Sequence, residues 1–453
     1  MFKVFDRLQR QVSIAPLVSF RILFGLMMLA GTIRFWVNGW ITSQYIAPKF
    51  YFTYIGFDWV RPLGDTGMHL LFGAIALSSF FLAVGFLYRL SASVFFMAFT
   101  YVELIDVTNY LNHYYFISLV AFMLIWLPAG RSWSVDTLIW PQLKRDSVPL
   151  WTIGIIRLQM GIVYFFAGIA KLNADWMLQA MPMKIWLPAK SHLPIVGELM
   201  YKEWIAYLFS WFGAVYDLSI AFLLINRRTR RLAYLFVLIF HTATAIFFPG
   251  IGMFPYVMMV GSTIFFSADE HRYILLKIKR LFGFHDDKRN RNTTYRFNNA
   301  VIPWMSAGLL LYFFLQIVVP LRYLLYPGRL FWYEEGYRFS WRVMLMEKSG
   351  NTFFRVVEPG TGKTYEVNNN AWLTPLQDKM MSTQPDMMLR YAHYLAKVYT
   401  ARGIKNPEVY AEAYVTLNGE RSKPYINTTV NLAVQPLSWQ HYTWVLPYTK
   451  HEK

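Results

Sequence analysis

Long apolar stretches, separated by short polar connections, fill the first 320 residues of the chain. Nine windows of about 18 to 23 residues carry few charges, which is the length that a helix needs to cross a bilayer. They lie at about 14–36, 66–88, 90–108, 113–130, 149–171, 204–226, 232–249, 251–267 and 299–319. The third, fourth and eighth windows are the weakest. We therefore expect an α-helical integral membrane protein with about nine transmembrane helices.

The pattern changes after Pro320, so we expect a helical membrane domain at 1–320 and a small α+β domain at 321–453. Alternation of apolar and polar residues predicts two hairpins in the second domain, each with a glycine-containing turn. Their strands are expected at Thr352–Glu358, Lys363–Asn368, Glu408–Leu417 and Arg421–Asn427. A helix is expected near 375–400, and the basic stretch 268–298 is expected to be a solvated loop.

Composition agrees with a membrane protein, because 56% of the residues are hydrophobic and only 15% are charged. Soluble domains carry about 25% charged residues. The net charge of +18 could indicate nucleic-acid binding, but the basic residues lie between the apolar segments and form no continuous basic stripe. The chain has no cysteine, which excludes disulfides, thiolate metal sites and cysteine nucleophiles.

The Lys and Arg residues are distributed unequally between the two predicted membrane sides. Nineteen lie at the N-terminus and in the connections that follow even-numbered windows, and six lie in the connections on the other side. Since basic residues favour the cytoplasmic side, the N-terminus is expected in the cytoplasm. Nine crossings then put the α+β domain outside.

Ionisable residues inside membrane windows are costly and therefore candidates for function. They are Arg21, Arg34, Glu103, Asp106, His113, Arg157, Asp217 and His241. For the arginines and carboxylates we expect internal pairing, for example of Arg157 or Arg21 with Glu103 or Asp217. Each histidine fits either a satisfied core position or a functional one.

Lys171 ends the fifth window and allows two interpretations. Its ammonium group could reach the headgroup water, as lysines at helix ends commonly do. Alternatively the amine is buried, so that its neutral form can act as a base. The chain lacks a His-Glu-x-x-His motif, a Gly-x-Ser-x-Gly motif and a P-loop. An amine, imidazoles and an Asn amide near one membrane face suit proton abstraction from a flat, lipophilic, hydroxylated molecule that enters from the bilayer.

Several ordered motifs resemble those of the vitamin K-dependent γ-glutamyl carboxylases, over nearly the whole chain. The densest matches are Leu111-Asn112-His113, Trp133-Ser134-Val135-Asp136, Lys171-Leu172-Asn173-Ala174-Asp175-Trp176, Asp217-Leu218-Ser219, Ile251-Gly252-Met253-Phe254 and Gly336-Tyr337-Arg338-Phe339-Ser340-Trp341. The resemblance implies an enzyme that oxidises vitamin K hydroquinone (phylloquinol or menaquinol) with O2 to the 2,3-epoxide. The same reaction adds CO2 to the γ-carbon of a glutamate in a peptide or protein substrate.

The resemblance also implies roles for individual residues. Lys171 would be the catalytic base toward the hydroquinone, while Asn112 and His113 would act at the quinone and in carboxylation. Tyr164 and His241 are further candidates for binding the quinone. The glutamyl substrate would be bound by Tyr337, Trp341 and Lys348, in a domain on the lumenal side.

The chain departs from the animal members, which have a longer C-terminal region and, in vertebrates, a disulfide. Thr244 stands where the family often has Asn. These differences fit a bacterial homologue in the inner membrane, or a protein of the ER membrane if it is eukaryotic. Two other functions remain open. One is a quinol epoxidase that does not carboxylate a peptide, and the other is a transporter or lipid-binding protein. A transporter would be expected to show internal repeats with broken helices, and the sequence shows neither.

Overall fold

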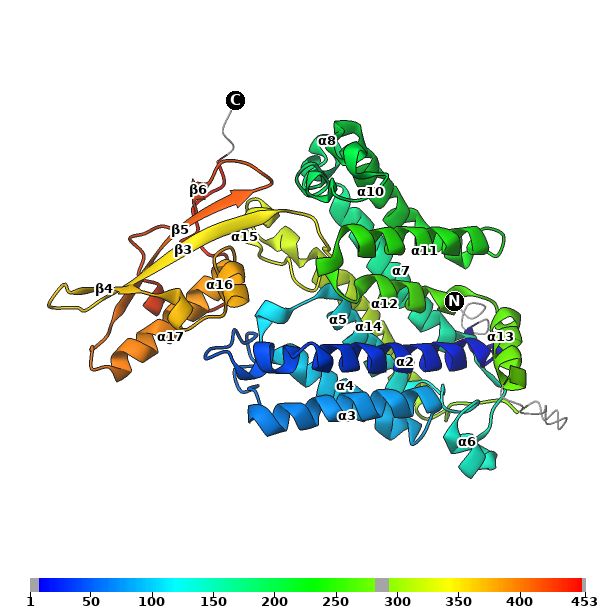
Figure 1. Ribbon diagram of the computed structural model, residues 1–453. Helices are drawn as coiled ribbons and strands as arrows, with labels where there is room; N and C mark the ends of the chain where they lie inside the picture. The colour runs from blue at the N-terminus through cyan, green and yellow to red at the C-terminus, as the bar shows by residue number, and fades with distance from the viewer. Residues whose placement is uncertain (1–7, 282–292, 450–453) are drawn as a thin grey trace.

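The computed structural model describes residues 8–281 and 293–449. Figure 1 shows a helical bundle with a small α+β domain at one end, while the helices α6 (Val135–Ile139) and α13 (Ala268–Leu281) lie at the opposite end. The expected combination of a helical domain and an α+β domain is therefore present.

A helix occupies each of the nine predicted windows within the described residues. These helices are α2 (Ala15–Val37), α3 (Gly64–Val84), α4 (Tyr88–Ile105), α5 (Asn112–Trp126), α7 (Leu150–Lys171), α10 (Glu203–Ile225), α11 (Arg230–Phe247), α12 (Phe254–Ser262) and α14 (Ile302–Leu321). Six of them are long and apolar enough to cross a membrane, and the remaining three, α4, α5 and α12, fill the three weakest windows. The structure thus supports six candidate spans, and nine crossings remain a prediction.

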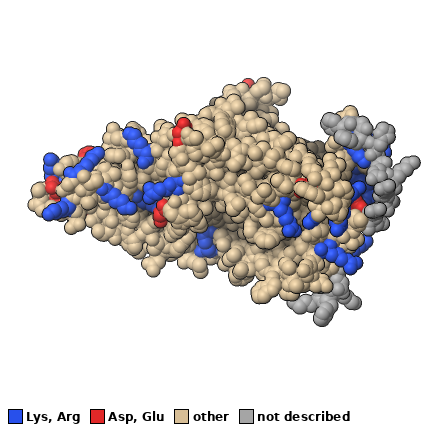
Figure 2. All heavy atoms as spheres, turned by 90° about the horizontal axis from the view of Figure 1, so that it is seen from below, with Lys and Arg blue, Asp and Glu red and all other residues tan. Residues whose placement is uncertain are grey.

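The outer surface of the bundle is apolar. In the window that contains α14 only 6% of the residues are buried, and large side chains such as Trp304, Leu310 and Phe314 are exposed. Figure 2 shows Lys and Arg gathered toward the two ends of the molecule, with few charged side chains across its middle. An apolar surface of this extent is stable only against another apolar phase, which indicates an integral membrane protein.

The expectation of a solvated loop at 268–298 is wrong for its first half. Residues Ala268–Leu281 form the amphipathic helix α13, which buries His271 and Leu275. Its exposed residues include the basic Arg272, Lys277 and Arg280, and the many basic residues of this stretch favoured the prediction of a solvated loop. The segment 282–292 lies outside the described residues.

The α+β domain contains a four-stranded antiparallel sheet of order β4-β3-β5-β6. The strands are β3 (Lys348–Val357), β4 (Thr364–Val367), β5 (Glu408–Leu417) and β6 (Lys423–Pro424), and the helices are α15 (Leu330–Tyr333), α16 (Pro375–Met381) and α17 (Pro385–Ala401). Buried and exposed residues alternate along β5, and its buried face packs with α17 in one hydrophobic cluster.

Both predicted hairpins are present, with two differences in length. Gly360 and Gly362 adopt positive φ between β3 and β4, and Asn418 and Gly419 do so after β5. The predicted strand Arg421–Asn427 shortens to two residues because Pro424 has no N–H to donate to the ladder. The helix expected near 375–400 is divided into α16 and α17, since Pro385 begins a second helix.

Hydrogen bonds between side chains attach the α+β domain to the bundle. Gln377 donates to the carboxylate of Asp106 at 2.9 Å, at the outer end of α4. Asn418 donates to Asp175 at 2.8 Å, just after α7. These two contacts hold the α+β domain directly over the ends of the helices that carry the candidate residues.

Candidate functional site

The side chain of Lys171 is buried at the C-terminal end of α7, with only 6% of the residue exposed. Its Nζ donates to Oδ2 of Asp217 at 2.7 Å and to the carbonyl of Ala167 at 3.3 Å. It also lies 5.4 Å from the ring centre of Trp176. The interpretation in which this amine reaches the headgroup water is therefore wrong, because the amine turns into the protein.

Asp217 comes from α10, which packs closely on α7 at Gly168. A Cβ atom on Gly168 would lie only 2.8 Å from the backbone nitrogen of Leu218, so a side chain there would push the helices apart. The close approach allows the short contact between Lys171 and Asp217.

The expected pairing of Arg157 or Arg21 with Glu103 or Asp217 is wrong. Arg157 donates to the carbonyls of Ile264 and Phe266 at 2.9 and 3.1 Å, and Arg21 donates to the carbonyl of Trp133. The acceptors for Arg157 lie at the end of a helix, where carbonyl groups lack partners within the helix, so its guanidinium group can bind them without a carboxylate. The carboxylate of Asp217 is thus left for Lys171.

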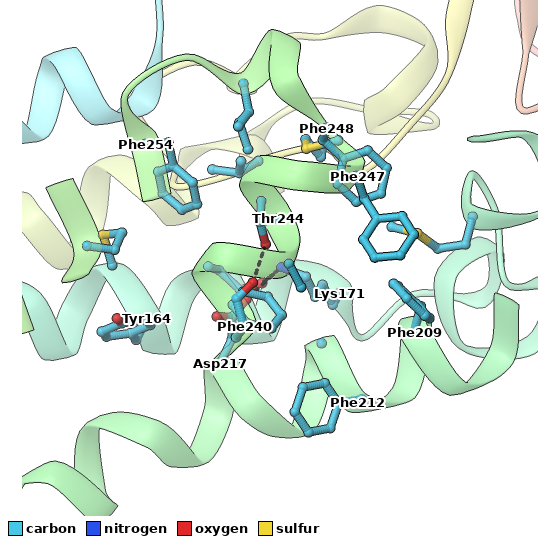
Figure 3. Close-up of a pocket in the computed structure, with 18 of the residues that line it drawn as sticks. Tyr164, Lys171, Phe209, Phe212, Asp217, Phe240, Thr244, Phe247, Phe248 and Phe254 are labelled. Carbon is cyan, nitrogen blue, oxygen red and sulfur yellow. Dashed lines mark hydrogen bonds and ion pairs between the residues drawn. The ribbon is translucent and has the colours of Figure 1, made fainter. Parts of the chain in front are cut away.

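Lys171 and Asp217 lie on the wall of a cavity of about 290 Å³. Figure 3 shows the aromatic residues around this cavity and the contact between the two charged groups. Its aromatic lining is formed by Tyr164, Trp176, Phe209, Phe212, Phe240, Phe247, Phe248 and Phe254. Thr244 also lines the cavity, and its hydroxyl donates to the carbonyl of Phe240 at 2.8 Å. A mostly aromatic lining with a few polar groups is typical of a site that binds a flat apolar molecule with few polar groups.

The cavity reaches the lipid-facing surface between α10 and α11. Leu208, Phe212 and Ile239 all line it, and they are 52%, 42% and 53% exposed. The cavity is open to the outside, and these half-exposed residues form its rim. A ligand therefore can enter from the apolar phase without passing through water.

Tyr164 and His241 form a buried polar group behind the cavity wall. The Tyr164 hydroxyl lies 3.3 Å from Nε2 of His241 and 3.0 Å from the hydroxyl of Ser262. Nδ1 of His241 has no hydrogen-bond partner among the described residues. The predicted pair is thus brought together, with Tyr164 on the cavity surface and His241 one layer deeper.

Asn112 and His113 begin α5 and lie beside the cavity rather than on its wall. The Asn112 amide donates to the carbonyl of Arg342 at 2.8 Å and accepts from the Tyr110 hydroxyl at 2.9 Å. His113 is buried, and its Nε2 is without a partner among the described residues. The Phe254 ring contacts both histidines, at 6.1 Å from His113 and 5.6 Å from His241.

The segment after α14 has an unusual backbone. Glu334, Phe339, Trp341 and Met344 all have φ between +52° and +60°, a conformation that costs non-glycine residues energy and that concentrates at functional sites. Trp341 stacks on Tyr115 of α5 with ring centres 5.0 Å apart. Val343 and Met344 line the Lys171 cavity, so this segment forms part of its wall.

Tyr337 and Lys348 lie in the α+β domain, away from the cavity wall. The Tyr337 ring packs on Phe331. The buried Lys348 amine donates to the carboxylate of Glu334 at 2.8 Å and to the hydroxyl of Tyr425 at 3.1 Å. Burial lowers the pKa of Lys348, and the Glu334 carboxylate opposes that shift. Of the three residues expected to bind the substrate, only Trp341 packs into the helical bundle.

Sequence reasoning missed the aromatic wall, although a signal for it exists. Phe240, Thr244 and Phe247 follow one another at spacings of four and three residues, and Phe209, Gly213 and Asp217 follow at spacings of four. Each set lies on one helix face, so the two faces could have been predicted to share a site. The described residues contain no group of three or more His, Asp or Glu that could hold a metal ion.

Two family models match the chain. The HTTM domain matches residues 9–269, which is more than half of the chain, and the vitamin K-dependent gamma-carboxylase lumenal domain matches residues 302–451. The second description indicates that the α+β domain lies outside the cytoplasm, in agreement with the orientation predicted from the basic residues. No solved structure matches the chain.

Proposed function

The chain belongs to the vitamin K-dependent γ-carboxylase family, and we propose that it is itself a vitamin K-dependent γ-glutamyl carboxylase. The proposed reaction couples oxidation of vitamin K hydroquinone by O2, to the 2,3-epoxide, with removal of a γ-proton from a peptide glutamate and addition of CO2. One observation carries the proposal. A buried amine faces a carboxylate on the wall of an aromatic cavity that opens to the lipid-facing surface.

The residues present fit a hydroquinone with a long apolar tail. Phenylalanine rings from α10 and α11 offer flat faces to a fused aromatic ring, and the opening between these helices would let the tail remain in lipid. The Lys171 amine and the Thr244 hydroxyl would contact the hydroxyl groups of the ring. When bound, the hydroquinone supplies the reducing electrons, and its oxidation supplies the strong base that removes the γ-proton.

Lys171 is proposed to take a proton from the hydroquinone, which requires a neutral amine. Asp217 supports that role by its position. A proton on the amine can pass to Oδ2 of Asp217, which lies 2.7 Å from Nζ, and this leaves a neutral amine beside a neutral acid. The pair carries no net charge in either arrangement of that proton, which suits an apolar cavity.

We propose supporting roles for the other predicted residues. Tyr164 and His241 would fix the ring position from one side, and His113 would act from the other side of Phe254. Asn112 holds the segment that carries Trp341 against the bundle through its bond to Arg342. Tyr337, Trp341 and Lys348 are proposed to shape the peptide side of the site.

We further propose nine membrane crossings, with the membrane domain at 1–320 and the domain at 321–453 on the outer side. We also propose a bacterial inner-membrane location and menaquinol as the natural hydroquinone; the sequence has no cysteine and so cannot form the disulfide of the vertebrate members.

The experiment that tests the function uses the purified full chain with reduced vitamin K, labelled bicarbonate and a glutamate-containing peptide. Formation of epoxide together with label fixed in the peptide is the expected result. Epoxide without fixed label would identify a quinol epoxidase. The absence of both epoxide and fixed label would overturn both assignments. A peptide with glutamine in place of glutamate is the matched control and should fix no label.

A further inference from the structure

Arg342 is a buried cation without an anionic partner among the described residues. Only 7% of the residue is exposed, and its Nε has no hydrogen-bond partner. Its guanidinium carbon lies 4.3 Å from the ring centre of Tyr323, and within the described ranges no carboxylate lies within ion-pair distance of it. Burial of an unpaired charge is expensive, so such a residue is retained where it serves a purpose other than stability.

Two other buried cations, Arg21 and Arg230, donate to backbone carbonyls, whereas four further cations with little or partial exposure are paired with carboxylates. These pairs are Lys171 with Asp217, Arg338 with Asp386, Lys348 with Glu334, and Lys423 with Glu420. Arg342 has no acidic partner among the described residues, and its side chain lines a cavity. A ligand bound in that cavity would supply the acceptor.

Space for a ligand exists directly beside Arg342. A cavity of about 270 Å³ is lined by Arg342 and Tyr323, by Arg329 and by residues from the end of α7. Asp175 also lines it, but its carboxylate already accepts from Arg329 and Asn418. Arg342 is therefore the cation in this cavity that is available to a new anion.

This second cavity and the Lys171 cavity lie on the two sides of the last turn of α7. Ile169 and Ala170 line the second cavity, whereas Ala167 and Lys171 line the first. Arg342 is followed directly by Val343 and Met344, which line the Lys171 cavity. An anion bound by Arg342 would therefore lie next to the wall of the proposed reaction site, on the side of the α+β domain.

We propose that Arg342 binds a glutamate carboxylate of the acceptor peptide and so selects acidic side chains beside the wall of the reaction site. The inference rests on the proposed function and adds a specificity residue to it. A guanidinium group donates two parallel hydrogen bonds to a carboxylate, which neither an amide nor a hydroxyl can match. Glutamine at the same position in the peptide would bind without that pair.

The test measures binding of two matched peptides, one with glutamate and one with glutamine, to the detergent-solubilised full chain. A charge-assisted pair predicts that the wild-type protein prefers the glutamate peptide by about tenfold to a hundredfold in Kd. Arg342→Gln should reduce this preference to less than about threefold, and Arg342→Lys should keep part of it because the charge remains. The matched control is Arg355→Gln on β3, an exposed arginine over Tyr410, which should keep the full preference.

Thermal stability separates this role from a structural one. Removal of an unpaired buried cation should leave the melting temperature of Arg342→Gln equal to that of the wild-type protein or higher. Loss of folding in both neutral variants, Arg342→Gln and Arg342→Met, would make Arg342 a structural residue and overturn the proposal. A folded Arg342→Gln protein that keeps the wild-type preference for glutamate would also overturn it.

Two measurements, label fixation and the preference for the glutamate peptide, separate the role of Arg342 from the carboxylase function. If the wild-type protein fixes label in the glutamate peptide and Arg342→Gln keeps the glutamate preference, only the role of Arg342 is wrong. If the wild-type protein shows no preference for glutamate and fixes no label, the role of Arg342 and the carboxylase function are both wrong.

Discussion

Replacement of Lys171 by alanine removes an amine and leaves the Asp217 carboxylate without its cation inside an apolar cavity. At the observed 2.7 Å and an effective dielectric constant of about 20, two unit charges attract by about 6 kcal/mol. Loss of hydration costs several kcal/mol for each ion, so the pair as a whole contributes little to stability. Loss of one partner, in contrast, is expected to cost about 3–5 kcal/mol.

Stability and activity should therefore respond differently to single and double substitutions. Lys171→Ala should lose about 3–5 kcal/mol of stability, and about 10²–10⁴-fold in quinol oxidation if Lys171 is the general base. The double variant Lys171→Met with Asp217→Leu should recover most of the stability, because two apolar residues of similar volume replace the pair. It should recover none of the activity. Thermal unfolding in detergent and epoxide formation measure the two effects separately.

Two further variants make the test specific for proton transfer. Small primary amines should partly restore epoxide formation by Lys171→Ala, because they can occupy the vacated space. Lys171→Arg should fold, since it keeps the ion pair, but should form little epoxide because a guanidinium group does not release its proton. Near wild-type epoxide formation by Lys171→Arg, or by the double variant, would refute the base assignment.

Three other predictions concern orientation and the α+β domain. A reporter fused after Lys453 should be extracytoplasmic and one inserted at Arg289, which lies outside the described residues, cytoplasmic; a cytoplasmic reporter after Lys453 would contradict nine crossings. Lys348→Met should lower the unfolding free energy by about 3–5 kcal/mol, because it leaves the largely buried Glu334 unpaired. Addition of Glu334→Gln to this variant should restore the stability. An unchanged stability with a raised KM for peptide would instead indicate direct substrate contact. Burial alone would raise the pKa of Asp386, but the Arg338 guanidinium outweighs it and holds that pKa below its usual value. The pair therefore stabilises the fold above about pH 4, the carboxylate's unfolded pKa, and that contribution is lost as the pH falls through the lower folded value. Asp386→Asn should remove this part of the acid sensitivity, and identical acid unfolding curves for variant and wild type would contradict it.

The features that depend on local sequence could be predicted well. Apolar length alone located the helices, and alternation located β5 at Glu408–Leu417. Turn chemistry located the positive-φ residues Asn418 and Gly419. Each of these signals lies within a few neighbouring residues, so no knowledge of the tertiary arrangement is needed. The burial of Lys171, one of two interpretations that the sequence allowed, is confirmed.

The features that depend on contacts between helices could not be predicted in the same way. The sequence shows that Asp217 lies within an apolar helix, but not which helix its side chain faces. Arg157 was predicted to pair with a carboxylate because the sequence does not show that the carbonyls of Ile264 and Phe266 lie beside it. The burial of Arg342 likewise depends on tertiary contacts. In the sequence it is an arginine shortly after a membrane helix, which is typical of an ordinary interfacial residue.

The opening between α10 and α11 determines how the affinity of this protein for the proposed quinol should be expressed. Leu208, Phe212 and Ile239 border that opening on the lipid-facing surface. A molecule that arrives through it comes from the bilayer, so the concentration that the protein senses is the mole fraction of quinol in lipid. Added detergent or lipid dilutes the quinol within this phase without changing its amount per volume of buffer. An apparent KM quoted per litre should therefore rise in proportion to the lipid added, whereas the same constant expressed as a mole fraction should stay fixed.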